Sequence, residues 1–350
     1  MGKSGCYDDP GFYGTVVQRD GRVNGPQAHS PAGAGLPYNP RSMAFGILGG
    51  RAVRTKAIIG LAALWLSAPA LSQQDFSTVE IRTVPVADGL YMLMGSGGNM
   101  AVSVGDDGTL LVDSEYAPLS EKIQAAIRAA GGGKVDFLIN THWHGDHTGG
   151  NENFGKAGAI IMAQDNVKAR MSTEQVMASL DGSVVPPSPP AALPVLTFPT
   201  RMSFHYNGDA INVIYAPNAH TDGDSIVHFT DLNAFHMGDT FFNGGYPFID
   251  VSSGGSIDGY IAAAEAVLSR CNDETRIIPG HGELASPEDL RAFHSLLVQA
   301  RERIQALIDA GMGEDAVVAA RPTAQWDAEW GAGFMDGPTF TRLAYQSLTR

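Results

Sequence analysis

The chain has 350 residues, of which 44% are hydrophobic and 17% are charged, enough for one catalytic domain with a sizeable core, alone or with appendages. Its 23 Lys and Arg stand against 37 Asp and Glu, a formal net charge of −14. A nucleic-acid substrate is therefore disfavoured, because protein cations must neutralise its phosphates.

Residues 1–42 are rich in Gly, Pro, Asn and Ser and lack a periodic apolar pattern. We expect disorder there or a mis-assigned start, with Met43 as the true initiator. Three basic residues then precede the apolar run AIIGLAALWL: Arg51, Arg54 and Lys56. Small residues follow, so residues 43–72 have the three-part layout of a signal peptide, cleaved after Ala70 or Ser72.

This leader predicts a periplasmic or secreted bacterial protein. The alternative is a membrane anchor, but the apolar run at 57–66 is too short to span a bilayer core of about 30 Å. We therefore expect no stable membrane anchor after cleavage. The leader to Ser72 holds seven of the 23 cations and three of the 37 acids, which leaves 16 against 34, near −18. Cys271 would then be the single cysteine, so we expect it to be structural.

The remaining residues, 73–350, are predicted to form one globular domain with a C-terminal helical segment. Apolar alternation predicts the first strands near 79–84, 89–94, 99–104 and 108–113, followed by a helix at 118–130. Next we expect a strand at 135–140, a short helix after Gly149, a strand at 158–163, a helix at 164–180 and a surface loop at 181–194. The last elements are strands at 201–206, 210–215, 225–230 and 233–237, and helices at 256–270 and 287–311 separated by the strand RIIPG. This order suggests two sheets packed face to face with helices outside.

The stretch THWHGDHTGG at 141–150 places four metal-binding side chains directly after the predicted strand: His142, His144, Asp146 and His147. In extended chain His142 and His144 point the same way, while the turn at Gly145 lets the other two reach a neighbouring position. This geometry suits two adjacent metal ions. The alternative is a histidine cluster on a solvated loop, but the complete H-x-H-x-D-H pattern favours metal.

Three further candidates stand where other predicted strands end. They are His220 in APNAHTDGDS, Asp239 in FHMGDTFF and His281 in RIIPGHGE. A carboxylate directly after an apolar strand is costly unless it is paired or bound to metal, which singles out Asp239. Beside His220, Asp222 and Asp224 either orient that imidazole or belong to a solvated turn.

Four segments in this order, THWHGDHTGGN, NAHTDGDS, HMGDT and IIPGHG, resemble the zinc hydrolases of the metallo-β-lactamase superfamily, over residues 79–295. The resemblance implies an α+β fold, a four-layer αββα sandwich with two Zn²⁺ ions at one edge. It also implies that His142, His144 and His220 bind the first zinc, that Asp146, His147 and His281 bind the second, and that Asp239 bridges them.

The chemistry of this ligand set supports a hydrolase that acts on a small molecule. Zinc lowers the pKa of a bound water from about 15.7 to roughly 7, so a hydroxide can attack the carbonyl of an amide, lactam, lactone or thioester. Asp146 would orient this nucleophile and move a proton, which makes it the candidate catalytic residue. The alternative is a persulfide-dioxygenase-type oxidoreductase, because His142, His220 and Asp239 could alone form a facial triad for one iron.

Two positions depart from the β-lactamases that the chain resembles most. Asp239 stands where many of them place a cysteine ligand, and Phe242 stands where they have a lysine for the substrate carboxylate. Both differences count against efficient penicillin hydrolysis, so β-lactamase activity stays open.

Overall fold

The structure is a computed structural model and describes residues 75–350. The predicted leader at 43–72 and the segment 1–42 lie outside the described residues. Within 75–350, no helix combines the length and apolar character needed to cross a bilayer.

The first sheet has seven strands in the order β1-β2-β3-β4-β5-β6-β9. An antiparallel meander forms its first half and consists of β1 (Arg82–Ala87), β2 (Leu90–Met94), β3 (Met100–Gly105) and β4 (Gly108–Val112). Parallel strands complete it: β5 (Phe137–Ile139), β6 (Ile160–Gln164) and β9 (Leu196–Phe198).

The second sheet has five strands in sequence order. The first four are antiparallel: β10 (Arg201–Tyr206), β11 (Asp209–Tyr215), β12 (Ser225–Phe229) and β13 (Ala234–His236). The last strand, β14 (Arg276–Ile278), runs parallel to β13. Both sheets thus contain a parallel pair, β4–β5 and β13–β14, and the strands of such a pair end at the same sheet edge.

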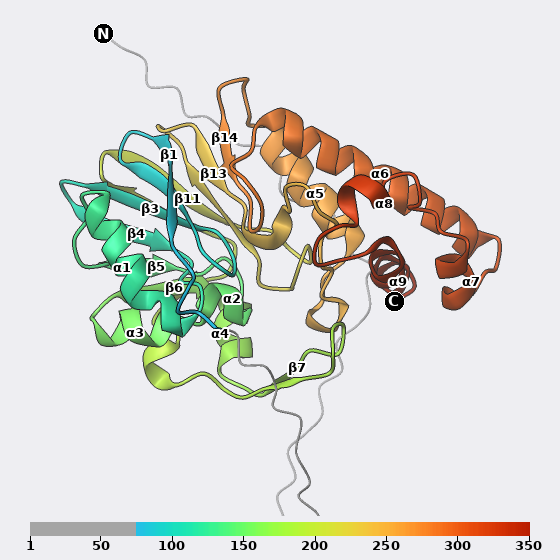
Figure 1. The fold of residues 1–350 in the computed structure, drawn as a ribbon, viewed down its shortest axis with the longest axis horizontal. Coiled ribbons are helices and arrows are strands. Elements are labelled where there is room, and N and C mark those ends of the chain that lie inside the picture. Colours follow the sequence, from blue (N-terminus) through green and yellow to red (C-terminus); the bar gives the residue numbers. More distant parts are fainter. Residues whose placement is uncertain (1–74) are drawn as a thin grey trace, which may run out of the picture. The chain divides into compact units, whose positions relative to one another are not determined.

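Alternation along the strands creates the layers. In β4, Leu110 and Val112 enter the core between the sheets, while Leu111 packs on the other face. That outer face is covered by α1 (Ser120–Ala129) and α3 (Asn151–Lys156). The outer face of the second sheet is covered by α5 (Ile257–Leu268) and α6 (Pro287–Asp309), as Figure 1 shows. The predicted αββα sandwich is confirmed.

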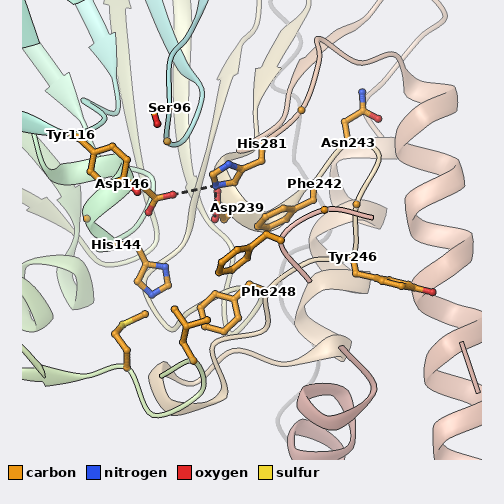
Figure 2. A pocket seen from close by; sticks show the side chains of 18 of the residues that line it. Ser96, Tyr116, His144, Asp146, Asp239, Phe242, Asn243, Tyr246, Phe248 and His281 are labelled. Atoms are coloured by element: carbon orange, nitrogen blue, oxygen red, sulfur yellow. Dashed lines mark ion pairs between the residues drawn. The ribbon is translucent and has the colours of Figure 1, made fainter. Parts of the chain in front are cut away.

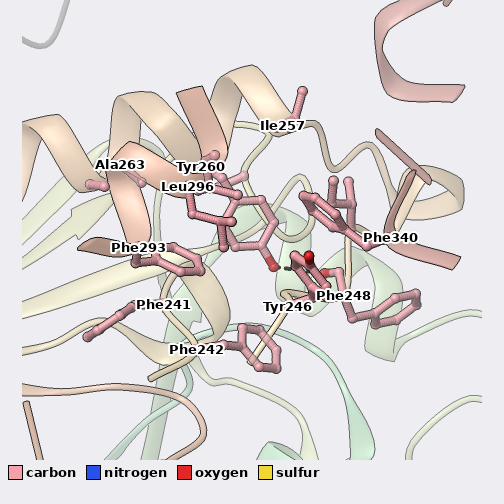
Figure 3. Close-up of a cluster of buried hydrophobic side chains, with 14 of the residues drawn as sticks. Phe241, Phe242, Tyr246, Phe248, Ile257, Tyr260, Ala263, Phe293, Leu296 and Phe340 are labelled. Carbon is pink, nitrogen blue, oxygen red and sulfur yellow. Dashed lines mark hydrogen bonds between the residues drawn. The ribbon is translucent and has the colours of Figure 1, made fainter. Parts of the chain in front are cut away.

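The core on the α5–α6 side is aromatic. Tyr260, Phe293 and Phe340 meet there with the loop that follows β13 (Figure 3). Helices near the C-terminus complete it: α7 (Glu314–Ala319), α8 (Asp327–Trp330) and α9 (Gly337–Leu348). The half-buried Cys271 packs against this core, as expected of a structural residue.

The helix predicted at 164–180 is wrong in its second half. The helix α4 spans only Asp165–Met171, and β7 (Gln175–Val176) pairs with β8 (Val184–Val185) in a hairpin. The side chain of Gln175 donates to the carbonyl of Arg170 at 3.2 Å, which caps the helix end instead of extending it. Segment 181–194 is therefore not a simple surface loop.

The first strand also begins later than predicted, at Arg82 instead of residue 79. Arg82 pairs with Met94, where β2 ends, so residues 79–81 have no partner in this ladder. The remaining elements are short: η1 (Ala117–Leu119), α2 (Gly145–Thr148), η2 (Pro190–Ala192), η3 (Gly238–Thr240) and η4 (Val251–Ser253).

Candidate metal centre

The H-x-H-x-D-H segment follows β5 directly, and its turn becomes the short helix α2. His144 is the N-cap of α2 and has extended backbone angles, so the chain changes from strand to helix within the motif. His142 and His147 are almost fully buried, whereas the Asp146 side chain is 25% exposed. The motif therefore presents buried imidazoles and one carboxylate that solvent and a substrate can reach.

The other three predicted residues come to the same place from the second sheet. His220 lies between β11 and β12, Asp239 lies in η3 after β13, and His281 follows β14. β11 and β13 both run antiparallel to β12, and β14 runs parallel to β13, so the ends of β11, β13 and β14 lie at the same edge of the second sheet. Figure 2 shows Asp146 and Asp239 both beside His281, with dashed lines for the two ion pairs.

All seven predicted side chains gather into three overlapping groups whose ligand atoms lie within 4.8 Å of one another. The groups are His142, His144 and His220; Asp146, His147 and His281; and His142, His147 and Asp239. Oδ2 of Asp239 is 3.5 Å from Nε2 of His220 and 3.4 Å from Nε2 of His281. Asp239 thus contacts both triads, in the partition that the family resemblance implies.

In the group of His142, His144 and His220, the rings of His144 and His220 each have one nitrogen held by a hydrogen-bond acceptor. Nε2 of His144 lies 3.0 Å from Oδ2 of Asp250, and because an ionised carboxylate only accepts, Nε2 carries the proton. Nδ1 of His220 lies 2.7 Å from the carbonyl of Phe248 and is likewise the donor. Nδ1 of His144 and Nε2 of His220 are then left with lone pairs, 2.8 Å apart.

Asp113 supports two more imidazoles. Its Oδ2 accepts from Nδ1 of His147 at 2.8 Å and from the hydroxyl of Thr141 at 2.7 Å. The Thr141 oxygen is in turn 3.0 Å from Nδ1 of His142. Both histidines therefore turn Nε2 towards the centre, which is the orientation that metal ligands with fixed outer partners adopt.

The donor atoms fit a metal. Nε2 of His142 is buried and makes no hydrogen bond, although buried polar atoms almost always do. Nε2 of His147 lies 2.9 Å from Oδ1 of Asp239 as a buried ion pair. An unsatisfied imidazole nitrogen beside a buried carboxylate is costly unless a cation joins them. Imidazole and carboxylate donors suit zinc, and iron accepts the same types.

Charges in the centre divide the histidines into two kinds. Burial lowers the pKa of His142 well below its usual value and that of His220 to about 4, so both are neutral and ready to bind a cation. For His147 and His281 burial acts in the same direction but is outweighed by Asp239 and Asp146. The pKa of His147 is raised well above its usual value and that of His281 to about 9.

Asp146 is ionised despite its surroundings. Burial would raise its pKa, but His147 and His281 lower it to about 2. The acids beside His220 have different roles from those proposed. Asp224 accepts from the backbone N–H of His220 at 2.6 Å and shapes the loop, while Asp222 pairs with Arg170 at 2.6 Å. Neither contacts the His220 ring.

Sequence reasoning missed several supporting residues. Asp113 ends an apolar strand and carries the signal that singled out Asp239, so it could have been found. Asp250 has no such signal, because its partner His144 is 106 positions away. Two glycines make room for ligands: a Cβ at Gly98 would lie 2.0 Å from the His147 ring, and one at Gly280 would lie 2.0 Å from Asp239.

Fold and centre together define the class: an αββα sandwich with a histidine- and aspartate-rich centre at one edge. The family model of the metallo-β-lactamase superfamily matches the sequence over residues 94–281, more than half of the chain. The chain belongs to this superfamily.

Curated relatives include hydroxyacylglutathione hydrolases from Polaromonas sp. strain JS666, 27% identical over 173 residues, and Nitrosococcus oceani, 29% identical over 169 residues. Each alignment covers 47% of this chain and 55% of the relative, so the chain spans about half the length of these curated relatives.

Two solved structures illustrate the breadth of the fold. The DIM-1 metallo-β-lactamase is 19% identical with a TM-score of 0.50, and the match covers 63% of this chain and 99% of that one. The sec-alkylsulfatase Pisa1 from Pseudomonas sp. is 14% identical with a TM-score of 0.58, covering 76% and 50%. At these identities the likeness concerns the fold alone.

Proposed function

We propose that this protein is a hydrolase that depends on two zinc ions and cleaves a carbonyl compound, an amide, lactam, lactone or thioester. One observation carries the proposal: two triads of ligand atoms meet at Asp239, and Nε2 of His142, which faces this carboxylate, is buried without a hydrogen bond. The name of the curated relatives, hydroxyacylglutathione hydrolase, supports a hydrolase.

His142, His144 and His220 would hold one ion, Asp146, His147 and His281 the other, with Asp239 between them. Bound there, zinc would supply a water of lowered pKa and polarise the substrate carbonyl. The chain's own contribution is orientation, because Asp113, Asp250 and the Phe248 carbonyl fix each imidazole before any ligand arrives.

Asp146 is the proposed catalytic residue. It lines the cavity above the centre, and its Oδ2 is 3.3 Å from Nε2 of His281 and 3.6 Å from Nε2 of His147. As an ionised carboxylate it accepts a hydrogen bond from the attacking water and orients it towards the carbonyl. The same oxygen then carries a proton towards the leaving group.

A single-iron oxidoreductase is the competing function, with His142, His220 and Asp239 as the ligands. With a single iron ion, the group of Asp146, His147 and His281 would bind no metal. A single-iron site therefore does not account for the clustering of these three side chains. Metal analysis of the purified protein separates the two: two equivalents of zinc support the hydrolase, and one tightly held iron without zinc contradicts it.

The decisive experiment is a hydrolysis panel. Penicillin, cephalosporin, carbapenem, lactone and thioester substrates are offered to the protein after chelation and again after zinc is restored. We expect at least one substrate to be cleaved only with zinc, and Asp146→Asn to lower kcat by roughly 10²–10⁴-fold, the usual contribution of an acid–base group. Hydrolysis that persists after complete chelation would contradict the proposal.

We also propose that the protein is exported. The order of basic, apolar and small residues in 43–72 supports this location.

A further inference from the structure

A cavity of about 660 Å³ opens directly above the centre. His144, Asp146, Asp239 and His281 form its floor, and Figure 2 shows them beside Phe242 and Phe248. Its size is within the range of pockets that enclose whole small molecules. Space therefore remains for a substrate group well beyond the reacting carbonyl.

One wall of the cavity is apolar and comes from the hairpin β7–β8. Met177, Leu180 and Val185 line it from the segment β7–β8, next to the indole of Trp143. Phe334 lines it from the segment between α8 and α9, and its ring lies 6.3 Å from that of Phe248.

The apolar lining continues to the protein surface. Phe334 is 68% exposed and Leu180 is 45% exposed, and both line the cavity with the more buried Met177 and Phe248. An exposed apolar surface that is continuous with an apolar pocket is a sign of binding to an apolar group. The exposed pair therefore indicates where the far end of a substrate leaves the centre.

Charge restricts the substrate as strongly as shape does. Among residues 75–350, no Lys or Arg lines this cavity. Its polar lining outside the centre is uncharged: Ser96, Tyr116, Asn243 and Tyr246. Burial, with Asp146 and Glu115 nearby, raises the pKa of Tyr116 to about 12, so its phenol stays neutral. An anionic group at the far end of a substrate would find no cation to pair with.

We propose that this site cleaves neutral esters or lactones with an apolar acyl chain, with the carbonyl at the centre and the chain along β7–β8 towards Phe334. The inference rests on the proposed hydrolase function and names its substrate class. Water adds to the carbonyl carbon, the acyl carbon–oxygen bond breaks, and a carboxylate, an alcohol and a proton are released.

The test compares p-nitrophenyl esters of acetate, butyrate, hexanoate and octanoate with the zinc-loaded protein. Each buried methylene is worth about fourfold (about 0.8 kcal/mol), so we expect kcat/KM to rise at least tenfold from acetate to octanoate. The mono-p-nitrophenyl ester of octanedioic acid has the same chain length with a terminal carboxylate. We expect it to react at least tenfold more slowly than the octanoate. Equal kcat/KM along the series, or an equally good charged ester, overturns the proposal.

Substitutions in the apolar wall of the cavity test whether its side chains cause the preference for long acyl chains. Leu180→Ser and Phe334→Ser should lower kcat/KM for octanoate at least fivefold more than for acetate. Val184→Ser is the control, because Val184 is 58% exposed on the same hairpin and does not line the cavity. It should match the wild type on both esters, and an equal loss in this control contradicts a specific role of Leu180 and Phe334.

A binding measurement separates this inference from the proposed function. If no p-nitrophenyl ester is hydrolysed but a lactam or thioester of the hydrolysis panel is, the ester proposal fails while the hydrolase proposal stands. If nothing in either series is hydrolysed, the hydrolase proposal fails, and calorimetry with octanamide and butanamide tests the apolar-chain site by itself. Octanamide should bind at least tenfold more tightly than butanamide, and Phe334→Ser should remove the difference. Equal affinities, or no binding of octanamide, overturn the apolar-chain site.

Discussion

The ring of Phe242 stacks on the imidazole of His281, with centroids 5.0 Å apart and planes 19° from parallel. Phe242 is 8% exposed, and its backbone forms a parallel bridge with that of His281. Phe242, which stands where the β-lactamases that the chain resembles have a lysine, therefore packs against His281, a proposed zinc ligand. A change at this position alters both charge and packing.

We expect the wild-type protein to hydrolyse carboxylate-bearing β-lactams slowly. In Phe242→Lys the affinity for such a lactam should rise roughly ten- to a hundredfold, because a charge-assisted hydrogen bond is worth about 1.5–3 kcal/mol. Phe242→Met is the control, since it removes the stacked ring without adding charge. Steady-state kinetics with one charged lactam and one neutral lactone measure the effect. A wild-type kcat/KM for the lactam near 10⁶ M⁻¹s⁻¹, roughly the middle of the usual enzyme range, would show that another group binds the carboxylate.

The second prediction concerns the contact between Asp250 and His144. Asp250→Asn keeps a group of the same shape but removes the charge that holds the Nε2 proton, so zinc affinity should fall about 10–100-fold. Competition with a chromogenic chelator measures this affinity. Asp222→Asn is the matched control, because Asp222 pairs with Arg170 and contacts no imidazole of the centre. An Asp250→Asn protein with unchanged affinity would show that His144 needs no outer partner.

The third prediction concerns Gly98. An added methyl group would overlap the ring of His147, which Asp113 holds in place, so Gly98→Ala should cost about 1–3 kcal/mol of unfolding free energy. It should also displace one zinc equivalent. Gly145→Ala is the control in the same motif, because a Cβ there meets no atom within 4 Å. Urea unfolding and metal analysis test both variants, and equal stability of the two would contradict the steric argument.

The fourth prediction follows from the raised pKa values of His147 and His281, which leave both rings protonated at pH 7.5 in the metal-free protein. A metal ligand must be deprotonated, so zinc binding should release about two protons at this pH. Raising the pH from 6.5 towards 9 removes the proton of His281 beforehand and should strengthen binding. Calorimetry in two buffers of different ionisation enthalpy counts the protons. Release of none would mean that both histidines are already neutral.

The fifth prediction concerns export. The mature N-terminus should be Leu71 or Gln73, because cleavage is expected after Ala70 or Ser72. Mass spectrometry of the protein purified from its native cells, with periplasmic and cytoplasmic fractions kept apart, identifies the terminus. An intact leader on a cytoplasmic protein would contradict the prediction.

Local patterns predicted the strands well but failed around residues 172–194. The strands β10 to β14 were expected close to where they lie, because alternating apolar residues identify a strand buried on one face and short apolar runs identify one buried on both. The hairpin β7–β8 has only two residues in each strand, too few for any periodicity. Met177 and Val185 pack against Trp143 and Met171, and this tertiary contact stabilises the hairpin.

Short motifs at strand ends were sufficient to predict the family, the layered fold and the seven candidate ligands. The groups that support these ligands, and the cavity above them, depend on contacts between distant segments. Asp250 reaches His144 across 106 positions, and Phe334 faces a hairpin about 150 positions earlier in the chain. Contacts of this kind arise when the two sheets pack and their parallel strand ends meet at one edge, so no local pattern records them.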